Sequence, residues 1–128
     1  MAEFKSEKAP KPVGLYPHAK RAGDFLFLSG VGPRQVIGDE IPKGIEAQCH
    51  SVFKNVRVVL EDSGARWDDL VDITVYLTDM KNDFPTYNRL WAEYFPDGKV
   101  CRTTVEVTAL PTPISIELKC VAYVGNQS

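Results

Sequence analysis

Residues 101–124, CRTTVEVTALPTPISIELKCVAYV, constrain the fold more than any other part of the chain. Polar and apolar residues alternate on both sides of a loop that contains Pro111 and Pro113. Because successive strand side chains point to opposite faces, this alternation predicts two β-strands. The second strand has one apolar face, which consists of Ile114, Ile116, Leu118, Cys120 and Ala122. The rest of the chain therefore has to cover that face.

Two charged residues project from the more polar faces of these strands. Arg102 shares its face with Thr104, and Glu117 lies opposite the apolar face of the second strand. An arginine fork suits a carboxylate ligand, and a nearby glutamate can accept a proton from water. A surface ion pair, or two unrelated solvated charges, explains the same pattern, because most strand charges lie on the wet face of a sheet.

Length, charge and hydropathy argue against several classes of protein. The chain has 128 residues, enough for one domain with a core and few enough for the subunit of an oligomer. Its net charge of -2 argues against binding to nucleic acid or to an anionic membrane. No apolar run is long enough to span a bilayer, and the N-terminus lacks the apolar core of a signal peptide, which predicts a cytoplasmic protein.

The chain upstream of residue 101 predicts an arm followed by one folded unit. The first residues are polar and contain Pro10 and Pro12, so we expect a flexible N-terminal arm over residues 1–13 and a single domain over residues 14–128. The elements predicted before the last two strands are strands over 18–22 and 25–29, a helix over 44–62, a strand over 70–77 and a helix over 82–95.

The order β, β, α, β, α, β, β predicts an α+β fold, with a mixed sheet and both helices on one face. The strands are apolar enough that the other face also needs cover, so we predict an oligomer that packs sheet against sheet. Asn88 falls within the spacing of an aromatic stripe on the second helix, and a buried amide there needs a backbone or ligand partner. The stripe, expected in the core or at a subunit contact, consists of Phe84, Tyr87, Trp91, Tyr94 and Phe95.

Several motifs in fixed order identify a family. They are Gly14-Leu15-Tyr16, Ser29-Gly30, Phe84 with Asn88, Arg102, Val105-Glu106-Val107, Leu110-Pro111 and Ile116-Glu117. In these motifs the chain resembles the RidA/YjgF family of small imine and enamine deaminases, from Gly14 to Val124. The resemblance implies a chorismate-mutase-like subunit in a homotrimeric barrel, with sheets inside, helices outside and sites between neighbours. Pairing of trimers into a hexamer is left open.

The resemblance also implies roles for residues in the site. Arg102 would hold the substrate carboxylate, Glu117 would position or activate the attacking water, and Tyr16 would line the pocket. Asn88 and the Ser29-Gly30 backbone would complete it. No metal or other cofactor is expected, because the only histidines are His18 and His50 and no ligand cluster is apparent.

Three positions depart from the usual family pattern. Thr104 stands where many members have cysteine, and Val31 and His18 stand where glutamine is common. With these changes the chain looks like the 2-aminomuconate deaminase branch, whose substrate carries a second carboxylate. A buried carboxylate needs a partner, and Arg34 is our choice over Arg21 and His18, because the loop after Arg34 could close over a ligand. A solvated Arg34 is the alternative.

The implied reaction is hydrolytic. A 2-amino-2-enoic acid becomes a 2-imino acid, water attacks the C=N carbon, and ammonia leaves a 2-oxo acid. The main hypothesis is conversion of 2-aminomuconate to 4-oxalocrotonate in the catabolism of aromatic compounds. Two alternatives are a general deaminase of 2-aminoacrylate and other 2-imino acids, and a non-catalytic protein that binds ligands or protein partners.

Overall fold

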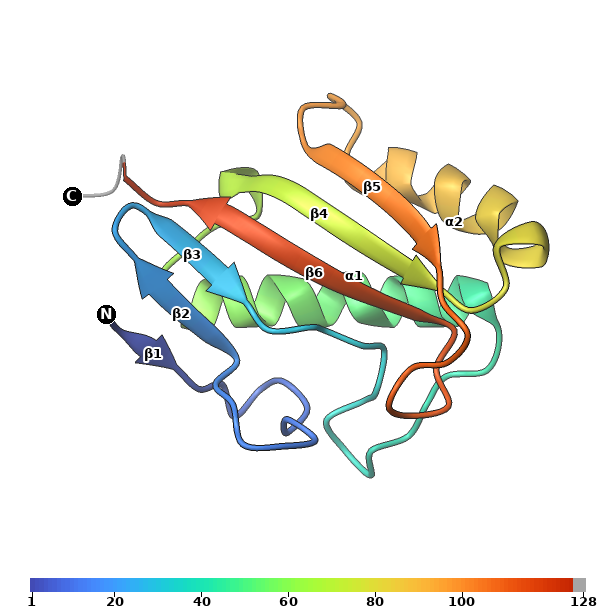
Figure 1. Ribbon diagram of the computed structural model, residues 1–128, viewed down its shortest axis with the longest axis horizontal. Coiled ribbons are helices and arrows are strands. Elements are labelled where there is room, and N and C mark those ends of the chain that lie inside the picture. Colours follow the sequence, from blue (N-terminus) through green and yellow to red (C-terminus); the bar gives the residue numbers. More distant parts are fainter. Residues whose placement is uncertain (126–128) are drawn as a thin grey trace.

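The computed structural model describes residues 1–125 and contains one mixed sheet and two α-helices (Figure 1). Its elements are β1 (Glu3–Phe4), β2 (Ala19–Ala22), β3 (Phe25–Leu28), α1 (Ile45–Asp62), β4 (Leu70–Leu77), α2 (Met80–Tyr94), β5 (Cys101–Glu106) and β6 (Ile116–Tyr123), with a short 3₁₀ turn at Trp67–Asp69. The predicted order of elements is confirmed, and β1 is added before it. Residues 126–128, at the end of the predicted domain, lie outside the described residues.

The sheet has six strands in the order β1-β2-β3-β6-β4-β5. Among the strands of residues 1–125, only β4 and β5 pair in parallel, and α2 makes the crossover between them. The two strands of residues 101–124 are therefore not neighbours, because β4 pairs with β5 on one side and with β6 on the other. This arrangement decides which side chains of β5 and β6 can meet.

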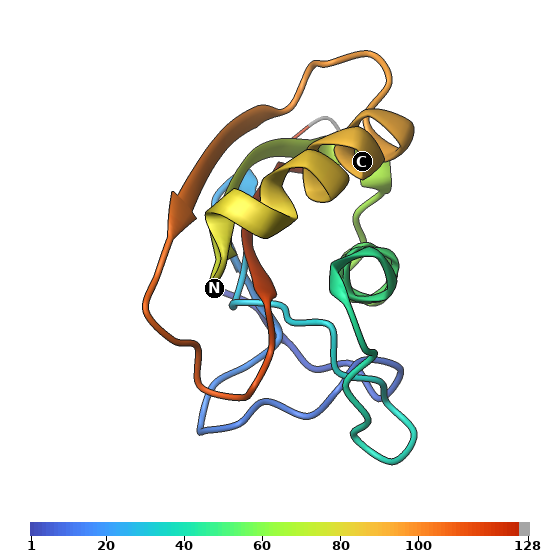
Figure 2. The ribbon, with the colours of Figure 1, turned by 90° about the vertical axis from the view of Figure 1, so that its right-hand side faces the viewer.

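Both helices lie on one side of the sheet, as predicted (Figure 2). The alternation in β6 is confirmed, since its apolar side chains are buried and those between them are partly exposed. In α1 the buried face follows the helical period, and it consists of Gln48, Cys49, Val52, Phe53, Asn55, Val56, Val59 and Leu60. The core thus lies between the sheet and α1.

One helix begins earlier than its pattern predicted. The Asp79 carboxylate accepts a hydrogen bond from the backbone N–H of Asn82, so α2 begins at Met80. The predicted end of α1 is found, and Gly64 follows with φ of 81°, a left-handed conformation that glycine adopts without strain.

Part of the expected N-terminal arm is packed against the domain. Strand β1 pairs with β2, Ala9 is only 4% exposed, and the Ser6 hydroxyl donates a 2.6 Å hydrogen bond to the Asp62 carboxylate at the end of α1. The division into an arm over residues 1–13 and a domain over residues 14–128 stays a prediction.

The face of the sheet away from the helices is open in the single subunit. Phe25 and Phe27 point to it and are each 41% exposed, and Val105 of β5 is exposed there as well. Apolar side chains gathered on a sheet face are typical of a surface that another chain covers. No helix among residues 1–125 is long and apolar enough to cross a membrane.

Candidate active site

Arg102 lies on the helix side of β5, stacked on the aromatic rings of α2. Its guanidinium carbon is 5.0 Å from the ring centroid of Trp91 and 5.2 Å from that of Tyr87. The Nη1 atom is buried and has no hydrogen-bond partner among the described residues. A buried cationic N–H group without an acceptor is costly, so the carboxylate of a ligand could supply the missing acceptor here.

Thr104 and Asn88 occupy different positions relative to Arg102. Thr104 shares the inner face of β5, and its Oγ1 is 2.8 Å from the hydroxyl of buried Tyr87. Burial raises the pKa of Tyr87, while this hydrogen bond and the charge of Arg102 act in the opposite direction. Asn88 is exposed. It follows Tyr87 directly, and one residue turns a helix by about 100°, so Asn88 does not join the buried stripe. We call Arg102 and Thr104 with these rings the arginine site.

Glu117 lies on the opposite face of the sheet from Arg102. Residues that pair across two strands share a face of the sheet. Arg102 pairs with Ile73, which is fully buried and faces the helices. Glu117 pairs with half-buried Tyr76, and its two neighbours in β6 are the residues that point to the core. Arg102 lies on the polar face of β5, as the sequence predicts, but that face is turned toward α2, so the alternative of a solvated surface charge does not apply. Its stem and guanidinium cover aromatic rings of α2, so the inner face of β5 is the one that carries the charge.

The Glu117 carboxylate is half-buried and accepts no hydrogen bond from residues 1–125. Burial raises the pKa of this carboxyl above its usual range. A carboxylate with a raised pKa is a stronger base, so it is better suited to take a proton from water.

Gly30 packs directly against this carboxylate. A pair of 2.9 Å backbone hydrogen bonds between Val31 and Leu118 holds the chain beside β6. A Cβ atom at residue 30 would lie 2.8 Å from Glu117 Oε2 and 3.1 Å from its Cδ. Glycine is therefore required at residue 30 for this carboxylate position.

Replacing Gly30 with alanine is expected to displace the Glu117 carboxylate and lower kcat by about 100-fold, as misplacement of a reacting group by about 1 Å does. Turnover and circular dichroism together measure this. The matched control is Gly32→Ala, whose Cβ would meet the flexible Ile114 side chain at 3.1 Å and should keep most activity. Equal activity of both variants would show that the position of Glu117 is unimportant.

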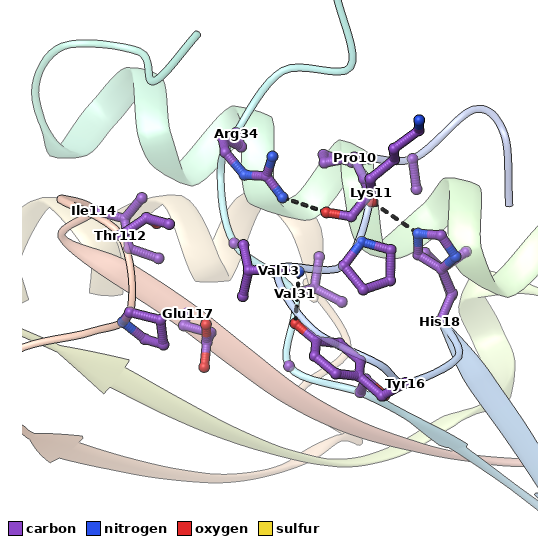
Figure 3. A pocket seen from close by; sticks show the side chains of 17 residues that line it. Pro10, Lys11, Val13, Tyr16, His18, Val31, Arg34, Thr112, Ile114 and Glu117 are labelled. Carbon is purple, nitrogen blue, oxygen red and sulfur yellow. Dashed lines mark hydrogen bonds between the residues drawn. The ribbon is translucent and has the colours of Figure 1, made fainter. Parts of the chain in front are cut away.

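Glu117 lines a pocket of about 170 Å³, which we call the Glu117 pocket (Figure 3). This pocket brings together several predicted site residues, namely Tyr16, His18, Ser29, Gly30, Arg34 and Glu117. It does not include Arg102, Thr104 or Asn88. The predicted site is thus divided into two parts within one subunit.

Buried amides of α1 hold the loop that forms one wall of this pocket. The Asn55 side chain donates to the carbonyls of Gly32 and Arg34 at 2.9 and 2.8 Å. The Ser29 hydroxyl donates to the carbonyl of Pro17 at 2.7 Å, which ties the end of β3 to the residue before His18. Ser29 therefore reaches the pocket with its hydroxyl already hydrogen-bonded.

The pocket has two walls that the sequence did not assign to it. One is the loop before β6, represented by Thr112 and Ile114, and the other is the chain from Ala9 to Val13. The prolines of both segments indicated loops, and no local pattern shows that two loops about a hundred residues apart in sequence converge.

The described residues were compared with the ligand sets that hold metal ions. Among residues 1–125 no cluster of three or more histidine, cysteine or acidic side chains has the geometry for it. Burial raises the pKa of Cys49 and of Cys120 to about 12, so both stay thiols, and Cys101 is exposed.

A family model described as Endoribonuclease L-PSP matches residues 6–124. A RutC family protein from Pyrococcus abyssi is 43% identical over 119 residues, which are 92% of this chain and 93% of the relative. Reactive Intermediate Deaminase A, chloroplastic, from Arabidopsis thaliana is 39% identical over 118 residues, 91% of this chain and 63% of that protein. The chain belongs to the RidA/YjgF family.

A solved RidA/YjgF-family structure shows the same fold. E. coli TdcF with bound serine superposes with a TM-score of 0.88 and 27% identity, covering 96% of this chain and 98% of TdcF. The subunit is thus a chorismate-mutase-like RidA fold, as the resemblance implied. The comparisons support the RidA/YjgF family and do not support the 2-aminomuconate branch in particular.

Proposed function

We propose that this protein is a hydrolytic deaminase of 2-imino acids and their enamine forms, such as 2-aminoacrylate. The observation that carries the proposal is the Glu117 carboxylate, which is half-buried, accepts no hydrogen bond from residues 1–125, and faces a pocket large enough for a small acid. A base placed in this way can activate water. The similarity to Reactive Intermediate Deaminase A supports the same class of reaction.

The reaction needs no external oxidant or cofactor. Arg102 binds the C1 carboxylate of the 2-imino acid with two parallel hydrogen bonds. The imine reacts as its protonated form, and Glu117 accepts a proton as water adds to the C=N carbon, giving a carbinolamine that carries OH and NH₂ on C2. Glu117 returns this proton to nitrogen, and the C–N bond breaks to release ammonia. The carbinolamine hydroxyl gives its proton to Glu117 as the C=O bond of the 2-oxo acid forms.

Both groups can act on one substrate only if two subunits contribute them, because Arg102 and Glu117 lie on opposite faces of the same sheet. We infer a homotrimer in which the open sheet face is covered and the arginine site of one subunit meets the Glu117 pocket of its neighbour. Pairing of trimers into a hexamer is compatible with this arrangement.

Subunit complementation tests this arrangement. Inactive Arg102→Ala and Glu117→Gln subunits are unfolded together and refolded as a mixture. In a one-to-one mixture about a quarter of the shared sites receive both native residues, so about a quarter of the wild-type rate should return. If both residues of a site came from one subunit, the mixture would stay inactive.

The activity itself is tested by ammonia release from 2-aminoacrylate that a separate β-eliminating enzyme generates in the assay. Wild type should speed the release above the spontaneous hydrolysis of the imine. Lack of acceleration, combined with binding of 2-oxo acids in calorimetry, would instead support the third hypothesis, a non-catalytic ligand-binding protein.

A second candidate substrate is 2-aminomuconate, and Arg34 is the residue that favours it. Arg34 lines the Glu117 pocket with 18% of its side chain exposed, so a cation is available for a second carboxylate. Its Nη1 donates to Asp39 at 2.8 Å, and its Nη2 donates to the carbonyl of Lys11, so a ligand would have to replace these acceptors.

Arg34→Ala is expected to raise KM for 2-aminomuconate about tenfold and to leave KM for 2-aminoacrylate unchanged, because only the first substrate has a second carboxylate. Steady-state ammonia release with both substrates measures it. Arg21→Ala is the control, since Arg21 donates to the Gly23 carbonyl in the β2–β3 turn and lies outside the pocket. If Arg34→Ala left the ratio of the two KM values unchanged, Arg34 would not bind the second carboxylate, and the argument for 2-aminomuconate as substrate would fail.

Other partners are less well supported by the charges. The family model carries the name of an endoribonuclease, but a net charge of -2 provides no surplus of cations for a phosphate backbone. A small carboxylate is the ligand we propose. A cytoplasmic location is part of the same proposal, because the chemistry acts on soluble metabolites and all the described cysteines are free thiols.

A further inference from the structure

Residues 6–13 are called the N-terminal strap. Its part from Ala9 to Val13 forms one wall of the Glu117 pocket, and side chains of the pocket itself hold the strap (Figure 3). The Tyr16 hydroxyl oxygen accepts the backbone N–H of Val13 at 3.2 Å, and Arg34 Nη2 donates to the Lys11 carbonyl. His18 makes two contacts with the strap, one through each ring nitrogen.

The two contacts of His18 determine its tautomer. The backbone N–H of Ser6 lies 2.9 Å from Nδ1 and can only donate, so Nδ1 is the unprotonated nitrogen. Nε2 lies 2.8 Å from the Pro10 carbonyl, which can only accept, so Nε2 carries the proton and donates it. The ring is therefore neutral and joins two points of the strap to the start of β2.

The strap separates two spaces. On one side is the Glu117 pocket of about 170 Å³, and on the other is an open groove of about 1050 Å³. Residues that line both spaces are Ala9, Lys11, Pro12, Tyr16 and His18. If the strap moves away, the pocket and the groove become one continuous cavity with room for a longer ligand.

We propose that His18 is a positioning residue that latches the N-terminal strap over the Glu117 pocket, and that the strap sets the length of the acid the pocket accepts. The selectivity part rests on the proposed function. The latch does not, because it follows from hydrogen bonds within the subunit. Opening of the latch also frees the Tyr16 hydroxyl and the Arg34 guanidinium for contact with a ligand.

Two substitutions test the latch. In His18→Gln the amide oxygen can accept the Ser6 N–H and the amide nitrogen can donate to the Pro10 carbonyl, so both hydrogen bonds can be kept. His18→Ala removes both bonds. His50, the other histidine, is bonded to the Tyr94 hydroxyl between α1 and α2, so His50→Ala is the matched control.

The first measurement is amide hydrogen exchange of the peptide over residues 5–13, corrected for intrinsic rates, at about pH 7.5. Wild type, His50→Ala and His18→Gln should stay protected, and His18→Ala should exchange about tenfold faster than wild type. Equal protection of His18→Ala and wild type would overturn the latch, whatever the protein's activity.

The second measurement compares a three-carbon and a six-carbon 2-imino acid as substrates. His18→Ala should lower the ratio of KM for the longer acid to KM for the shorter acid about tenfold, and His18→Gln should restore the wild-type ratio. If a variant with a released strap kept the wild-type selectivity, the proposal that the strap limits the length of the acid would be wrong. If no variant, wild type included, turns over either acid, the proposed function fails. In that case, calorimetric affinities of wild type and His18→Ala for the matching three-carbon and six-carbon 2-oxo acids test whether the strap limits ligand length.

Discussion

Replacing Arg102 with alanine is expected to lower kcat/KM for 2-aminoacrylate by about 100-fold to 10,000-fold, mostly through KM. Two charge-assisted hydrogen bonds to the substrate carboxylate are lost, and each is worth about 1.5–3 kcal/mol. The measurement is steady-state ammonia release under conditions where the imine is generated faster than it hydrolyses spontaneously.

The chain offers a matched control for this substitution. The Arg57 guanidinium carbon also stacks on an aromatic ring, 4.8 Å from the centroid of Trp67, but Arg57 is an exposed residue of α1. Arg57→Ala removes the same kind of cation–π contact and should leave turnover unchanged. If both variants were equally active, the guanidinium of Arg102 would have no role beyond packing.

Arg102→Lys separates charge from geometry. Lysine keeps the positive charge but cannot form two parallel hydrogen bonds with a carboxylate. We expect it to recover only part of the lost kcat/KM, about tenfold above Arg102→Ala. Full recovery would mean that the site needs a charge and not the fork.

Replacing Glu117 with glutamine is expected to lower kcat by about 100-fold to 10,000-fold, the range that a lost general base produces, with little effect on KM. The amide is close in shape to the carboxyl and fits beside Gly30, but it cannot accept a proton from water. Stopped and continuous ammonia assays at saturating substrate measure the loss. Glu61→Gln, at an exposed position of α1, is the control and should be as active as wild type.

The same substitution has an opposite effect on stability. Burial raises the pKa of Glu117 in the folded protein, so the folded state binds the proton more tightly than the unfolded state does. Wild type is therefore destabilised by this carboxylate above its raised pKa, and the penalty disappears as pH falls below the ordinary range of glutamate. Glu117→Gln should melt at a higher temperature than wild type near neutral pH and at the same temperature in acid. A lower melting temperature near neutral pH would show that the carboxylate is stabilised by its surroundings.

The activity of wild type should follow the same group. The base form of Glu117 is required, so kcat should fall as pH drops through the raised pKa of this carboxyl. In a plot of kcat against pH, this acidic limb should lie at a higher pH than the usual pKa range of a glutamate. If the residual activity of Glu117→Gln shows no such limb, the limb belongs to Glu117.

Elements with a strong local period were predicted correctly from the sequence. The alternation from Ile116 to Ala122 gives the buried and open faces of β6, and the helical spacing from Cys49 to Leu60 gives the inner face of α1. The two-residue β1 has no period of its own, and it exists because Glu3 pairs with Lys20 of β2. Helix α2 begins at Met80, two residues before the start that the aromatic pattern predicted, because the Asp79 carboxylate caps the helix there.

The candidate site shows the same division. The motifs identify Arg102, Glu117, Tyr16 and Ser29-Gly30 as residues of interest, and the structure gathers all of these except Arg102 around one pocket. The walls formed by the strap and by Thr112 could not be predicted, because they depend on loops that meet only after folding. The tautomer of His18 likewise depends on Ser6 and Pro10.

The sequence by itself determined the family, the α+β class, the succession of elements and the alternation within each strand, because motifs and periodicity are properties of neighbouring residues. Only the tertiary structure decided that Arg102 faces α2 while Glu117 faces the open side of the sheet. That outcome depends on β4 lying between β5 and β6 and on the rings of α2 accepting a guanidinium, and both are relations between segments far apart in the chain.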